Sequence, residues 1–179
     1  MTQTRQDDTS EGTSHIVVMG VSGSGKTTIA HGVADRLGWE FAEADDFHPQ
    51  RNIDKMSAGI PLDDDDRGPW LEDVAAWMAA RAADGRSTVV ACSALKRSYR
   101  DILRDGPPRV GFVHLDGPIA AIGERLSGRT GHFMPASLLQ SQVDALEPLD
   151  AGEHGIQLDL RQTPDQLIAA AVDWIETAF

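Results

Sequence analysis

A run of eight residues near the start of the chain has the types and spacing of a phosphate-binding loop. It begins at Gly20 and ends on Gly25-Lys26-Thr27, so it fits the pattern G-x-x-x-x-G-K-[ST]. In this pattern backbone N–H groups surround phosphate oxygens, the lysine ammonium reaches the β- and γ-phosphates, and the hydroxyl binds Mg²⁺. It therefore predicts ATP and Mg²⁺ as cofactors, Lys26 as a catalytic cation and Thr27 as a metal ligand. The expected nucleotide contacts are Gly20, Val21, Ser22, Gly23, Ser24, Gly25, Lys26, Thr27 and Thr28.

Two carboxylates follow the next apolar segment. Glu43 and Asp45 are two positions apart, so on a strand their side chains share one face. In an open α/β sheet, ligands bind at the carboxyl ends of the strands. One carboxylate there can organise Mg²⁺ through water and the other can accept the proton of an attacking hydroxyl. We expect Asp45 to be the base, although the spacing also allows Glu43, and both acids would otherwise be solvated groups near the start of a helix.

A basic, glycine-containing stretch later in the chain has the composition of a flap. Arg125 and Arg129 are four positions apart and would share a face if the preceding helix continues. A flap arginine can neutralise the charge that spreads over the transferring phosphoryl group. We therefore expect Arg129 to be catalytic, Arg125 to bind ATP and His132 to cover the acceptor. The alternative is a basic helix end that stabilises its own dipole.

The rest of the chain supplies elements to position these groups. Short apolar runs predict strands, and apolar residues at helical spacing predict helices between them. The strands are expected at 15–20, 39–43, 87–92, 109–115 and, more weakly, 155–160; the helices at 26–37, 49–58, 69–84, 96–105, 118–127, 135–147 and 164–178. This alternation predicts an α/β fold of the phosphate-loop kinase type, with a parallel sheet of about five strands. We expect a disordered tail over 1–14 and one domain over 15–179, with an acceptor region near 47–84 and a lid near 125–135.

The composition limits the partners and the compartment. The chain has 179 residues and a net charge of −12, which disfavours binding to nucleic acid or to an anionic membrane surface. The sequence has no apolar run long enough to span a bilayer. A single cysteine excludes an intramolecular disulfide and favours a reducing compartment. We expect a cytoplasmic protein.

Several ordered segments carry a specific resemblance. Glu43 begins E-x-D-x-F-H-P, Arg51 begins R-N-x-x-K-M-x-x-G-x-P-L-x-D-x-D-R-x-P-W-L, and Cys92 begins C-S-A-L-K. Arg129 begins R-x-G-H-F-M, and L-L-x-S-Q follows from Leu138. Together these segments, spread over nearly the whole chain, resemble the gluconokinase family. The resemblance implies a homodimeric enzyme that uses ATP to phosphorylate the 6-hydroxyl of D-gluconate, a sugar acid, and a distant kinship with shikimate kinases.

The acceptor side contributes the remaining candidates. Arg67 stands in a cluster of acids, and a bidentate guanidinium is the usual group that binds a carboxylate. Only three residues are lysine, against thirteen arginines, and each lysine falls in a segment already named. The expected substrate-binding residues are Glu43, Asp45, His48, Lys55, Arg67, Lys96 and His132. Two other functions remain open: a kinase of another hydroxy acid or of a nucleotide, and a regulatory module that binds a nucleotide without an acceptor.

Overall fold

The computed structural model describes residues 12–127 and 136–179. Most of the expected lid, with Arg129 and His132, lies outside these residues. Residues 1–11 of the expected tail also lie outside them, whereas Thr13 and Ser14, expected in that tail, are both buried. The Ser14 backbone N–H donates to the Ser87 hydroxyl at 3.0 Å, a contact with a residue far along the chain that the polar sequence does not indicate.

Five parallel strands form one sheet in the order β2-β3-β1-β4-β5, as the alternation of strands and helices predicts. The strands are β1 (His15–Met19), β2 (Glu40–Glu43), β3 (Thr88–Ala91), β4 (Val110–Asp116) and β5 (Gly155–Asp159). The central strand β1 is wholly buried, because helices cover both of its faces. The α/β fold of the phosphate-loop kinase type is confirmed.

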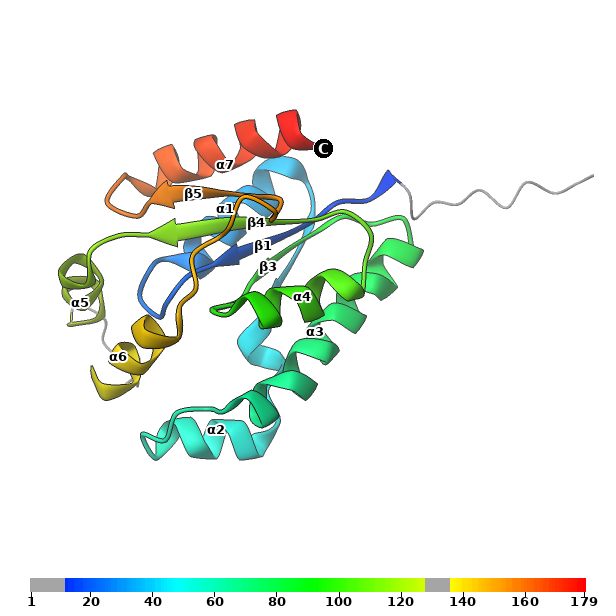
Figure 1. Ribbon diagram of the computed structural model, residues 1–179. Helices are drawn as coiled ribbons and strands as arrows, with labels where there is room; N and C mark the ends of the chain where they lie inside the picture. Colours follow the sequence, from blue (N-terminus) through cyan, green and yellow to red (C-terminus); the bar gives the residue numbers. More distant parts are fainter. Residues whose placement is uncertain (1–11, 128–135) are drawn as a thin grey trace, which may run out of the picture.

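Helices lie on both faces of the sheet (Figure 1). They are α1 (Lys26–Leu37), α2 (Gln50–Ser57), α3 (Asp64–Ala83), α4 (Arg97–Asp105), α5 (Ile119–Ser127), α6 (Ala136–Ala145) and α7 (Pro164–Ala178). On one face α1 and α7 pack against Ile16 and Val18, and on the other α3 and α4 pack against Val17 and Met19. Among the described residues, no helix is long and apolar enough to cross a membrane.

Helix α3 begins five residues before the predicted start at residue 69. Asp63 is its N-cap, and a capping box joins the side chain of each of Asp63 and Asp66 to the backbone N–H of the other. Three of the four consecutive acids therefore lie in the first turn, where the helix dipole favours negative charge. Pro69 lies inside the helix and not near its start.

The chain leaves the sheet directly after Glu43. Residues Ala44–Phe47 form a short 3₁₀ helix, so Asp45 is not on a strand and the expected shared face with Glu43 is wrong. The cause is packing: Ala44 is fully buried, and its carbonyl accepts a hydrogen bond from the Trp70 indole N–H at 2.7 Å. That bond from α3 holds the turn that carries Asp45.

Candidate active site

The phosphate loop joins β1 to α1 at the edge of the sheet toward which the strands point. Gly20, Gly23 and Gly25 all have positive φ, and a Cβ on Gly20 would lie 2.8 Å from the Leu115 carbonyl oxygen. Gly25 is the N-cap of α1 and brings no side chain to its first N–H groups, which suits an anion at this helix end. The Lys26 ammonium donates to the Val21 carbonyl at 3.0 Å and so lies across the loop.

Thr27 and Glu43 bring two oxygen-bearing side chains together beside the loop. The Thr27 hydroxyl donates to a carboxylate oxygen of Glu43 at 2.6 Å. Burial raises the pKa of Glu43, the charge of Asp45 acts in the same direction, and the Thr27 hydrogen bond opposes them. Hydroxyl and carboxylate oxygens are the donors that Mg²⁺ takes, so these two residues fit the ion predicted from the phosphate-loop pattern.

A hollow beside the loop brings together residues from distant parts of the chain. The phosphate loop gives Lys26, the 3₁₀ turn gives Asp45 and His48 follows it, while Arg67 comes from α3. Ser22, Met56, Leu62, Trp70, Ser93 and Gln142 complete its lining. We call this the acceptor hollow. It places a cation that can bind a phosphate next to a carboxylate that can accept a proton.

His48 is fixed beside Asp45 by aromatic and polar contacts. Its ring stacks on Trp70 with the centroids 4.0 Å apart, and its Nδ1 lies 3.2 Å from the Asn52 amide nitrogen. Its Nε2 lies 3.6 Å from a carboxylate oxygen of Asp45. The methyl group of Ala44, where the family resemblance leads us to expect glycine, points into the core and does not line the hollow.

The remaining two lysines are held by acids of α3. The Lys55 ammonium lies 2.7 Å from a carboxylate oxygen of Asp66, and this hydrogen bond raises the pKa of Lys55. Lys55 thus contacts the start of α3, and it is not among the residues that line the acceptor hollow. The Lys96 ammonium lies 3.0 Å from Asp64 and lines a neighbouring hollow that also contains Arg67.

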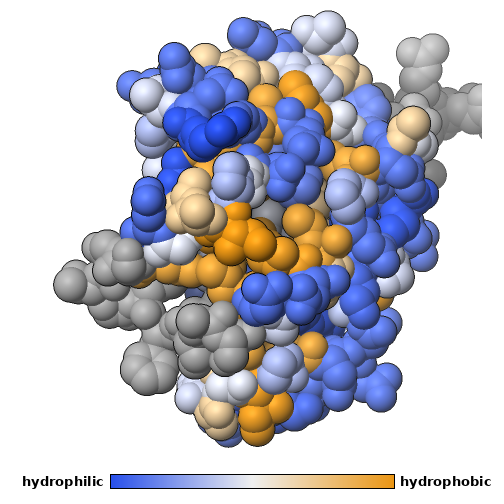
Figure 2. Space-filling model, turned by 60° about the vertical axis from the view of Figure 1, so that its left-hand side comes forward, coloured by the Kyte–Doolittle hydropathy of each residue, from blue (hydrophilic) through white to orange (hydrophobic). Residues whose placement is uncertain are grey.

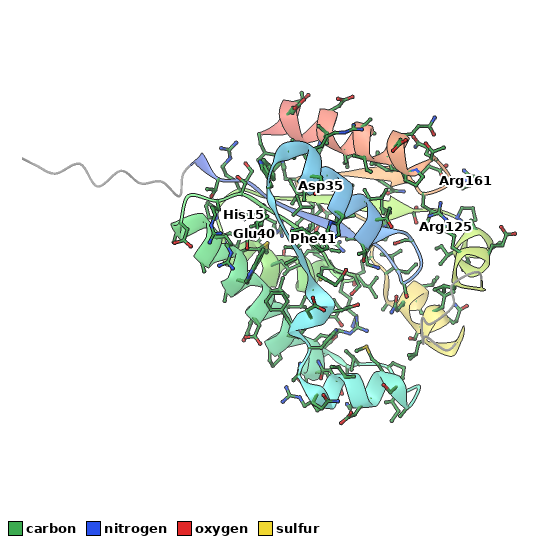
Figure 3. The ribbon with its side chains drawn as sticks, turned by 180° about the vertical axis from the view of Figure 1, so that it is seen from behind. His15, Asp35, Glu40, Phe41, Arg125 and Arg161 are labelled. Carbon is green, nitrogen blue, oxygen red and sulfur yellow. The ribbon has the colours of Figure 1, made fainter. Side chains whose placement is uncertain are left out.

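A separate hollow of about 360 Å³ lies on the other side of the phosphate loop. Thr28 and Arg125, both predicted to bind ATP, line it together with Ser24 and Gly25. The Arg125 guanidinium donates to the Ser24 carbonyl at 3.2 Å. Figure 3 shows Arg125 at the same end of the molecule as the phosphate loop, with His15 at the opposite end of the sheet. The hollow has the position and the partly apolar lining to take a nucleoside.

The face toward which the strands point is mixed in character. In Figure 2 apolar side chains gather at the centre of the view and hydrophilic ones surround them. Such an arrangement is usual for small-molecule sites, in which a few polar groups orient a ligand against apolar walls.

Comparison with known proteins agrees with the geometry. A family model described as an AAA domain matches residues 16–149. The gluconokinase of Gluconobacter oxydans is 48% identical to this chain over 153 residues, which are 86% of each protein. The chain belongs to the gluconokinase family. The structure of a gluconokinase from Sinorhizobium meliloti has a TM-score of 0.84 and 45% identity over 92% of both chains. A sugar kinase structure from Janibacter has a TM-score of 0.89 and 65% identity, and the match covers 92% of this chain and 95% of that one.

Helix α6 contributes Gln142 to this gluconokinase-family site, although Gln142 was not among the predicted site residues. The Gln142 side-chain carbonyl accepts a hydrogen bond from the Ser22 backbone N–H at 2.7 Å, and both residues line the acceptor hollow. Gln142 belongs to the L-L-x-S-Q segment that supported the family resemblance, which was the available signal. Trp70 and Ser93 also line the hollow and were likewise part of quoted family segments.

Proposed function

We propose that this chain transfers the γ-phosphoryl group of ATP to the 6-hydroxyl of D-gluconate. The observation that carries the proposal is that Lys26 of the phosphate loop and Asp45 line one hollow. A phosphate-binding cation and a proton acceptor are the two groups that transfer to an alcohol requires. The relatives named gluconokinases support gluconate as the acceptor.

The residues take the following roles in the proposed reaction. Lys26 neutralises charge on the β- and γ-phosphates, and Asp45 accepts a hydrogen bond from the acceptor hydroxyl and then its proton. His48, whose Nε2 lies 3.6 Å from Asp45, helps to bind the acceptor. Thr27 would bind Mg²⁺ directly and Glu43 would hold it through water. The bound ion would supply positive charge to the phosphates of ATP.

The proposal extends to residues and partners that the structure does not describe. Arg129 contributes positive charge to the transferring phosphoryl group, and His132 covers the acceptor. The enzyme acts as a homodimer in the cytoplasm. Sedimentation velocity of the purified chain tests the dimer, and a monomer across the working concentration range would refute it.

A coupled assay of ADP release tests the reaction. Purified protein with Mg-ATP is given D-gluconate, shikimate or a nucleoside monophosphate, with Lys26→Met as the inactive control. We expect ADP release with D-gluconate alone, and a product whose phosphorus NMR coupling places the ester on carbon 6. Turnover of shikimate or a nucleotide without gluconate would refute the substrate, and no acceptor-dependent ADP release at all would favour a regulatory module.

A further inference from the structure

A second hollow lies next to the acceptor hollow. Leu62 and Arg67 line both, so the two share one wall. Lys96 and Tyr99, at the start of α4, and Asp64, in the first turn of α3, line the second hollow. Lys26 and Asp45 line the first hollow and not the second, so the reacting groups lie on one side of this shared wall.

The second hollow already contains a carboxylate, which belongs to the chain itself. The Lys96 ammonium lies 3.0 Å from an oxygen of Asp64, and the Tyr99 hydroxyl donates to the same oxygen. These two hydrogen bonds lower the pKa of Asp64, Tyr99 first, and the charge of Arg67 acts in the same direction. The guanidinium of Arg67 lies 5.4 Å from the centre of the Tyr99 ring. Two donors, Lys96 and Tyr99, thus bind a single carboxylate, and the positive charge of Arg67 lies nearby.

Asp64 can be solvated by water when it leaves this group of donors. Its side chain is 66% exposed, so water can solvate it in another rotamer. The capping box of α3 is built from Asp63 and Asp66, so a rotation of Asp64 leaves the helix start intact. A carboxylate of a ligand would find the same two donors, Lys96 and Tyr99, and the same nearby charge of Arg67.

We infer that Lys96, Tyr99 and Arg67 form the subsite for the carboxylate of the acceptor, and that this carboxylate displaces Asp64. The inference rests on the proposed function, because it assigns the two ends of the sugar acid to the two hollows. The acceptor class is then a linear polyhydroxy acid, with its terminal hydroxyl at Asp45 and its carboxylate at Lys96. An uncharged polyol of the same length leaves Asp64 in place and loses the charged contacts.

The first test compares D-gluconate with D-glucitol, in which a hydroxymethyl group replaces the carboxylate. Each is measured as a substrate and as a competitive inhibitor, in the wild type and in Lys96→Met. Because a hydrogen bond to a charged group is lost, we expect kcat/KM for gluconate to fall about 10- to 100-fold. Binding of glucitol should stay within about twofold. Arg36→Met, an exposed charge change on α1, is the control and should alter neither.

The second test uses two neighbouring acids of one helix turn. Asp64→Asn removes the competing charge, and we expect the KM for gluconate to fall several-fold. Asp65→Asn makes the same change of net charge at an exposed residue that lines neither hollow, and it should leave KM unchanged. A tenfold rise of KM in Asp64→Asn would show that Asp64 binds the substrate and is not displaced.

The outcomes separate the two proposals. If the wild type does not phosphorylate gluconate, the proposed function fails and the subsite fails with it. If it does, but folded Lys96→Met keeps the wild-type preference for gluconate over glucitol, the subsite alone is refuted. Unchanged melting temperatures of the variants establish that they are folded.

Discussion

Replacement of Arg100 by methionine should destabilise the protein more than any exposed arginine change. Arg100 on α4 and Glu153 before β5 have fully buried side chains that form two parallel hydrogen bonds, at 2.7 and 2.9 Å. The guanidinium also donates to the carbonyls of Ala94 and Leu95 at 2.9 and 3.2 Å. Arg100→Met therefore leaves a carboxylate buried without its partner.

The expected loss is about 3–5 kcal/mol of unfolding free energy, the usual cost of removing one member of a buried ion pair. For a domain of this size that loss corresponds to a fall in melting temperature of roughly 6–20 °C. Activity should fall as well, because Arg100 holds the loop after β3, in which Ala94 has a φ of 44° and Ser93 lines the acceptor hollow.

Urea unfolding followed by circular dichroism measures the effect. Arg104→Met is the matched control from the same helix; its side chain is 27% exposed and pairs with Asp101, which is 52% exposed, so it should cost less than about 1 kcal/mol. The double variant Arg100→Met/Glu153→Leu should recover most of the loss, since replacement of a whole buried pair by apolar groups is often neutral. A single-variant loss below about 1 kcal/mol, or a double variant less stable than the single, would refute this reasoning.

Four further predictions concern catalysis and pH. Asp45→Asn should lower kcat by roughly 10²–10⁴-fold in steady-state kinetics, while nucleotide titration should show a nearly unchanged affinity for ATP. Near-normal turnover would make Glu43 the better candidate for the base. Lys26→Arg should lower kcat/KM about 100-fold or more in the ADP-release assay, because a planar guanidinium does not replace a compact ammonium in the loop; wild-type kinetics would contradict this. Arg129→Ala should lower kcat/KM by about 10²-fold without a change in melting temperature, and a parallel loss of stability would point to a structural role. Burial lowers the pKa of His15 from 6.5 to about 4, so the unfolded chain binds the proton more readily than the folded one. The free energy of unfolding should therefore fall by up to about 3 kcal/mol as pH drops from 6.5 toward 4. His15→Gln should flatten this pH dependence in urea titrations, and an equal pH dependence in both proteins would refute the assignment.

Local patterns predicted the fold well, because each strand and helix is specified by its own residues. The apolar run before Gly20 and the helical spacing after Lys26 are contained within short windows. The predicted start at residue 69 is too late, because helical spacing of apolar residues begins only at Trp70, after a run of four acids. Asp63 is the N-cap of α3 and Asp66 is its partner in the capping box, so this helix starts within a polar run that apolar periodicity does not identify.

The sequence predicts the candidate site only where all the residues of a feature lie within one short motif. The phosphate loop is such a motif. The bond between Ser22 and Gln142 joins residues 120 positions apart, and the periodicity of either segment does not indicate it. The turn at Ala44 depends on a bond from Trp70, and so strand alternation misplaced Asp45. Long-range packing, which one sequence does not reveal, decides these positions.

The strand order has a consequence for how the chain is made. β1 is synthesised first, yet its partners are β3 and β4, and His15 pairs with Thr88, 73 positions later. β2 pairs with β3 as well. Among the strands that the structure describes, no pair can therefore form before β3 has left the ribosome. The apolar residues of β1 and α1 remain without a sheet during that interval, when a growing chain is prone to aggregate and to bind chaperones.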